Sequence, residues 1–94
     1  MLSGCAFDTI KREMGSAVGQ PVSAVVAHLG LPTEDKVVAG KQVYIWSTSN
    51  FVDGTNYRCQ IRAVLDDKDI ITSWDYDGNL GGCQRLADRF PFKF

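Results

Sequence analysis

The chain has 94 residues, of which 45% are hydrophobic and 22% are charged, and these values are typical of one small globular domain. Ten basic and eleven acidic residues give a formal net charge of -1, so nucleic-acid binding, which requires clustered Lys and Arg, is not expected. No apolar run approaches the roughly 18 to 20 residues of a membrane-spanning helix. Because a domain of this size buries only about two-thirds of its unfolded surface, a cross-link between two of its three cysteines would add much to its stability.

The first five residues, Met1-Leu2-Ser3-Gly4-Cys5, resemble a bacterial lipobox, the site at which a lipoprotein signal peptide is cut and the cysteine thiol is acylated. Acyl chains on such a cysteine partition into lipid at about 0.8 kcal/mol per buried methylene. The charged and apolar segments that precede a lipobox are missing, so we interpret Met1 as an internal start. We therefore expect residues 1–6 to be the lipobox and membrane tether, with lipid attached to Cys5, and residues 7–94 to be one domain. The alternative is a cytosolic protein in which Cys5 is an ordinary thiol.

Two short helices are expected next along the chain. Phe7, Ile10 and Met14 recur at helical spacing, which indicates an amphipathic helix or a tether, interrupted at Gly15-Ser16. A second helix is predicted to begin near Pro21, because proline at the first helical position loses no backbone hydrogen bond. Its apolar stripe is Val22, Val25, Val26 and Leu29, and Gly30 ends it.

The remainder of the chain is predicted to form strands. Residues 36–39 and 42–47 are expected to make a hairpin about a turn at Gly40-Lys41. Residues 47–56 are interpreted as a mobile loop, because they are rich in Ser, Thr, Asn and Gly. Residues 57–65 alternate with period two, which places one apolar set on the buried side of a strand: Cys59, Ile61, Ala63 and Leu65.

The last strand, residues 70–76, follows the polar turn at residues 66–69 and ends near Asp77. Residues 77–82 are too glycine-rich to predict as regular structure, and residues 83–90 are expected to form at most one helical turn before Pro91. The predicted fold is therefore α+β, with one or two N-terminal helices followed by a three- to four-stranded antiparallel meander. One face of that sheet would be covered by the helices and the other would be at least partly wet.

Residues 18–32, followed by Gly40 and Tyr44-Ile45-Trp46, resemble the SmpA/OmlA (BamE-like) small lipoproteins. The shared pattern is a glycine, a short helix, Leu-Gly-x-Pro, and a glycine turn that leads into an aromatic strand. Gly78-Asn79-x-Gly81-Gly82-Cys83 departs from that family and is closer to uncharacterised proteobacterial lipoproteins of the same layout. The resemblance implies a lipid-anchored, periplasm-facing module that binds other proteins. By the same resemblance, alanine after Cys5 is compatible with enterobacterial-type sorting to the outer membrane.

The cysteines give the most specific structural prediction. If the hairpin turn centres near Lys68, Cys59 lies roughly opposite Asp77, and the glycine-rich segment can return Cys83 beside it. A Cys59–Cys83 disulfide would stabilise the fold by roughly 3 kcal/mol and would agree with an oxidising compartment. The alternative is two free buried thiols. We expect no metal site, because three cysteines and one histidine lack the paired spacing of zinc ligands.

No catalytic constellation is evident in the sequence. Asp75 and Asp77 resemble the start of a calcium loop, but Leu80 and Leu86 stand where that loop needs Gly and Glu. His28 has no nucleophile or orienting group in its sequence pattern, so we interpret it as a surface or half-buried residue.

The candidate partner surface is aromatic, since such residues are favoured at binding hot spots; it comprises Tyr44, Trp46, Phe51, Phe92 and Phe94. Tyr44 and Trp46 lie on a predicted strand, and aromatic residues on alternating strands more often belong to the core. The predicted function is a non-enzymatic, lipid-anchored protein-interaction module of the bacterial envelope, without a cofactor. The alternatives are an inhibitor or peptide-binding domain that acts on a periplasmic enzyme, and a cytosolic domain.

Overall fold

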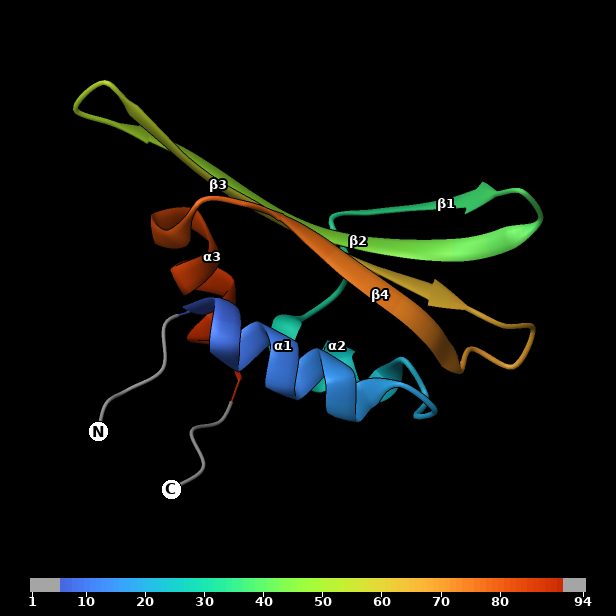
Figure 1. The fold of residues 1–94 in the computed structure, drawn as a ribbon. Helices are drawn as coiled ribbons and strands as arrows, with labels where there is room; N and C mark the ends of the chain where they lie inside the picture. Colours follow the sequence, from blue (N-terminus) through green and yellow to red (C-terminus); the bar gives the residue numbers. More distant parts are fainter. Residues whose placement is uncertain (1–5, 91–94) are drawn as a thin grey trace.

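The computed structural model describes residues 6–90 (Figure 1). In this part of the chain, two helices precede a four-stranded sheet and a third helix follows it. The elements are α1 (Ala6–Ala17), α2 (Ser23–Leu29), β1 (Glu34–Val38), β2 (Lys41–Val52), β3 (Thr55–Leu65), β4 (Ile71–Gly78) and α3 (Leu80–Ala87). The predicted α+β class and antiparallel meander are confirmed, but the helices are not all N-terminal.

The strands lie in the order β1-β2-β3-β4, each antiparallel to the next. Along β3 the predicted inward set is buried and alternates with residues that are less buried: Cys59, Ile61, Ala63 and Leu65. Figure 1 shows all three helices on one side of the sheet, and these four residues belong to the core that the helices cover. None of the helices within residues 6–90 is long and apolar enough to cross a membrane.

The core is completed by apolar residues from each helix. Ile10 and Met14 of α1 and Leu86 of α3 are fully buried, and α1 packs mainly against α3. Trp46 of β2 is only 1% exposed. Its indole Nε1 donates a hydrogen bond of 2.8 Å to the carbonyl oxygen of Gly30, just after α2. This bond satisfies the one polar atom of a buried indole and fixes the end of α2 against the sheet.

The predicted helix boundaries were wrong in two places. α1 continues through Gly15-Ser16 to Ala17, because a buried stripe at Ile10, Met14 and Ala17 outweighs the roughly 1 kcal/mol cost of a helical glycine. α2 begins at Ser23, two residues after Pro21. Pro21 instead forms an isolated antiparallel bridge with Ile70, so it belongs to the end of the sheet and not to the helix.

The predicted mobile loop at residues 47–56 was also wrong. β2 and β3 continue through it and pair as far as Val52 opposite Thr55. The two residues of the turn, Asp53 and Gly54, have φ angles of 50° and 82°. This is the left-handed backbone of a two-residue hairpin turn, for which Asp-Gly is a favoured sequence. The Asp-Gly signal outranks the polar composition around it.

The glycine-rich segment after β4 is regular, contrary to the prediction. β4 ends at Gly78, Asn79 accepts a hydrogen bond of 2.9 Å from the backbone N–H of Gly82, and α3 begins at Leu80. Asparagine is a favoured N-cap because its side chain satisfies an N–H of the first helical turn. The strand register also differs by one residue from the prediction: Cys59 lies opposite Gly78 instead of Asp77, since the pairing shifts at Val64/Leu65.

Candidate interaction surface

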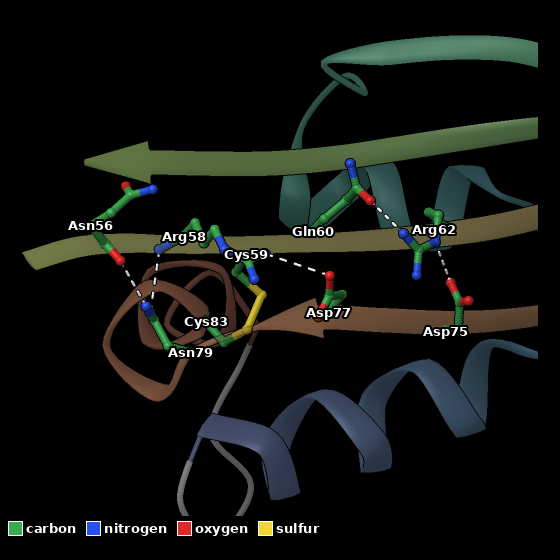
Figure 2. Close-up of polar contacts among 9 residues, drawn as sticks. All are labelled: Asn56, Arg58, Cys59, Gln60, Arg62, Asp75, Asp77, Asn79 and Cys83. Atoms are coloured by element: carbon green, nitrogen blue, oxygen red, sulfur yellow. Dashed lines mark hydrogen bonds and ion pairs between the residues drawn. A yellow bond between two sulfur atoms is a disulfide. The ribbon is translucent and has the colours of Figure 1, made fainter. Parts of the chain in front are cut away.

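The end of the sheet near α3 is held by a disulfide. The Sγ atoms of Cys59 in β3 and Cys83 in α3 are 2.06 Å apart, and their Cα atoms are 4.7 Å apart, which agrees with the predicted pair (Figure 2). Beside it, Asn79 donates a hydrogen bond of 2.7 Å to the carbonyl oxygen of Asn56. The side-chain oxygen of Asn79 also accepts a bond of 3.2 Å from the N–H of Arg58. Asn79 thus ties the start of α3 to β3 on its outer edge.

The side of the sheet that faces away from the helices is called the open face here. It carries a depression of about 390 Å³ lined by residues of all four strands. The floor of the depression is apolar and consists of Val38, Val43, Ile45 and Val64. Within this floor, Val43 and Ile45 are only 8% and 2% exposed, whereas Val38 of β1 is 51% exposed. Two apolar side chains, Val43 and Ile45, are therefore buried on the side of the sheet that carries no helix.

Polar side chains border this floor in a cross-strand ladder (Figure 2). Arg62 Nε of β3 donates a hydrogen bond of 2.6 Å to Asp75 Oδ1 of β4, and Arg62 Nη1 donates one to Gln60 Oε1. Arg58 Nη1 and Asp77 Oδ2 are 3.5 Å apart. The hydrogen bond that Arg62 donates to Asp75 raises the pKa of the Arg62 guanidinium. The Arg62 side chain is held on two sides, so the polar border of the floor is fixed in position.

A two-stranded ribbon projects beyond the sheet. β4 stops opposite Cys59 and β1 stops opposite Ile45, so the pairs from Ser49 opposite Arg58 to Val52 opposite Thr55 extend past both neighbouring strands. We call residues 49–58 the arm; Figure 1 shows it pointing away from the helices. Phe51 near its tip is 71% exposed. By strand alternation Phe51 lies on the same side of β2 as Val43 and Ile45, so the open face continues onto the arm.

The predicted aromatic surface does not form one patch. The assignment of Trp46 to this surface is wrong, and its alternative assignment to the core is confirmed, because the indole is only 1% exposed on the helix side of the sheet. Tyr44 is half-buried on the helix side, where it lines a shallow groove with residues of α2 and β1. Phe51 is exposed as predicted but lies on the other side of β2. Cys5, Phe92 and Phe94 lie outside the described residues.

The apolar floor of the open face was not predicted. A signal for it exists in the unbroken run Val43-Tyr44-Ile45-Trp46, since a strand that is apolar at consecutive positions is typical of burial on both sides. Val38 and Val64 gave no comparable signal, because they join the floor from two other strands.

The remaining sequence candidates do not meet at this surface. His28 is exposed on α2, with its ring centroid 5.9 Å from that of Phe90. The carboxylates of the rejected calcium loop form ion pairs across the sheet: Asp75 with Arg62 and Asp77 with Arg58. Within residues 6–90 no group of three or more His, Cys, Asp or Glu side chains is arranged to hold a metal ion.

Comparison of the chain with protein-family models, with curated proteins and with solved structures gives no match.

Proposed function

We propose that the protein is a non-enzymatic, lipid-anchored component of the bacterial cell envelope that binds other proteins through the open face of its sheet. The observation that carries this proposal is the open face itself, where an apolar floor is framed by the Arg62–Asp75 pair. Binding hot spots are commonly apolar anchors that enter such a floor inside a polar rim. A depression of about 390 Å³ accommodates a few apolar side chains of a partner.

The envelope location is supported by the cysteines. Disulfides persist in oxidising compartments such as the periplasm, and the Cys59–Cys83 bond joins two fully buried sulfur atoms of the core. The lipobox-like sequence that ends at Cys5 supplies the proposed anchor. The resemblance to SmpA/OmlA lipoproteins, and sorting to the outer membrane, stay part of this proposal.

The anchor is tested by expressing the protein with its natural upstream sequence and measuring the mass of the mature N-terminus. We expect a Cys5 that carries acyl chains, and a Cys5→Ser variant that carries none. The wild-type protein should be recovered in the membrane fraction, and the Cys5→Ser variant should not. An unmodified N-terminus at Cys5 would remove the membrane part of the proposal and leave the binding part standing.

The binding surface is tested with a matched pair of positions on β1. Val38 and Val37 are adjacent and 51% and 66% exposed, but only Val38 lines the open face. A photo-crosslinking amino acid at position 38 should capture a discrete envelope protein in cells, and the same residue at position 37 should capture much less of it. Val38→Lys should abolish the contact that Val37→Lys preserves. Equal capture at both positions would show that the open face is not the binding surface.

A further inference from the structure

The outer edge of β2 is free along the arm. β1 pairs with β2 only up to Glu34 opposite Ile45. Thr33 takes the next position, since its N–H donates to the Ile45 carbonyl at 2.8 Å and its Oγ1 accepts from the Ser47 N–H at 3.0 Å. Backbone groups that point to one edge recur at every second residue of a strand. The N–H and C=O groups of Ser49 and Phe51 therefore point to this same edge, and within residues 6–90 they have no hydrogen-bond partner there.

This edge lacks the features that protect strand edges from other chains. Natural edge strands are guarded by charged side chains, proline, bulges or short length. β1 carries Glu34, Asp35 and Lys36, and β4 carries Asp75 and Asp77. From Ser47 to Val52, β2 has neither a charged residue nor a proline or glycine. The β3 edge of the arm is partly covered, because Asn79 bonds the N–H of Arg58 and the carbonyl oxygen of Asn56 there. Among the described edges of the sheet, the β2 edge of the arm is therefore the one that can accept another strand.

We propose that a second copy of this chain adds to the edge as an antiparallel strand, with Asn50 of one copy opposite Asn50 of the other. This register follows from the two free positions, because it places Ser49 of each copy opposite Phe51 of the other and satisfies the N–H and C=O groups of both residues. A register shifted toward the base of the arm would require the Ser47 position, which Thr33 already occupies.

The side chains of the edge suit a second copy. A symmetric antiparallel pair sets each residue opposite itself or a near neighbour, so any charge in the segment would face a like charge. Residues 48–52 contain none. In the proposed register the two Phe51 rings are diagonal neighbours at about 7–8 Å, which is within reach of aromatic side chains. Pairing would therefore cover the 71% exposed Phe51 of each copy. This pairing uses the backbone edge of β2, whereas the proposed function uses the open face of the sheet. The inference therefore does not depend on the proposed function.

The register is tested by disulfide trapping in a Cys5→Ser background, in which Cys59 and Cys83 are already bonded. Residues opposite one another without mutual hydrogen bonds have Cα atoms about 4.5 Å apart, which a disulfide can bridge. Asn50→Cys should form a covalent dimer under mild oxidation, at least about tenfold more than Lys11→Cys, an exposed thiol on α1, because the pairing raises its effective concentration. Thr48→Cys and Val52→Cys should dimerise poorly alone and cross-link to each other when mixed.

A further variant tests whether the strand edge causes the trapping. Ser49→Pro removes the outward N–H while leaving the β2–β3 ladder intact, and should reduce Asn50→Cys dimer formation to the level of the α1 control. Ser49→Thr keeps the N–H and should retain the dimer. The proposal is overturned if Asn50→Cys and Lys11→Cys dimerise equally, or if Thr48→Cys cross-links to itself as well as it does to Val52→Cys. If an Asn50 variant does not fold, cross-linking between Thr48→Cys and Val52→Cys still tests the proposed register.

Discussion

Gly82 of α3 lies directly against the backbone of Arg58 in β3. A Cβ atom at Gly82 would be 2.3 Å from both the nitrogen and the carbonyl oxygen of Arg58, a separation that real Cβ atoms essentially never show. The glycine therefore lets a helix rest on a strand backbone-to-backbone, next to the Cys59–Cys83 bond. This explains why glycine stands at position 82, although glycine is a poor helix former.

Gly82→Ala should destabilise the protein by about 3 kcal/mol, since the added methyl group overpacks a site bounded by backbone that cannot rotate away. The free energy of unfolding from denaturant titration measures this. Gly15→Ala is the matched control, because Gly15 is also helical but has nothing within 4 Å of its Cβ position. We expect that control to stabilise the protein by about 0.5–1 kcal/mol. Equal effects at the two glycines would contradict the close packing.

Loss of the disulfide should lower the free energy of unfolding by roughly 3 kcal/mol, because the bond closes a loop between residues separated by 24 positions. Denaturant titration with and without a reductant measures the difference. The double variant Cys59→Ala/Cys83→Ala should be insensitive to reductant. A wild-type protein whose transition midpoint does not change on full reduction would contradict this expectation.

Trp46→Phe should destabilise the fold by about 1–3 kcal/mol, since it leaves the carbonyl oxygen of Gly30 without the indole N–H as its donor. Trp74→Phe should cost less, because Trp74 is only partly buried and stacks on Tyr76. Thermal or denaturant unfolding of the two variants provides the comparison. A larger loss at Trp74 would mean that the Gly30 contact contributes little.

Asp66 should make folding stability depend on acid pH. Its carboxylate accepts backbone hydrogen bonds from Ile70 at 2.9 Å and Lys68 at 2.8 Å, which hold the pKa of Asp66 below its ordinary value of 3.8. Because the folded-state pKa is depressed, the stabilisation is present above pH 3.8 and is lost as the pH falls through the folded-state pKa. A carboxyl NMR titration should give this low pKa, and Asp66→Asn should flatten the loss of stability in acid. A pKa at or above the ordinary value would refute the turn geometry.

Regular alternation and strong turn residues made much of the sheet predictable. The inward set of β3 and its hairpin with β4 follow from period two and the polar turn at residues 66–69. The arm was missed because polar composition was given more weight than Asp53-Gly54. α3 was missed because its two glycines are required by contacts with distant residues: Gly81 lies against Tyr57 and Gly82 lies against Arg58. Both contacts join residues more than twenty positions apart, and local helix propensity does not predict them.

The site was less predictable than the fold. Aromatic residues predicted as a binding surface were sorted by the register of β2, which sends Trp46 to the core and Phe51 to the open side. A shift of one residue would have reversed that outcome. The residue types alone did not show which side of the sheet each aromatic side chain faces.

The placement of the two end helices has a consequence for folding. Each strand pairs with the strand that precedes it in the sequence, so the meander can form hairpin by hairpin. Helix α1 precedes the sheet in the sequence, yet it packs mainly on α3, which follows the sheet. A folding intermediate in which α3 has not docked would therefore leave much of the apolar stripe of Ile10 and Met14 exposed, and this species would be prone to aggregate.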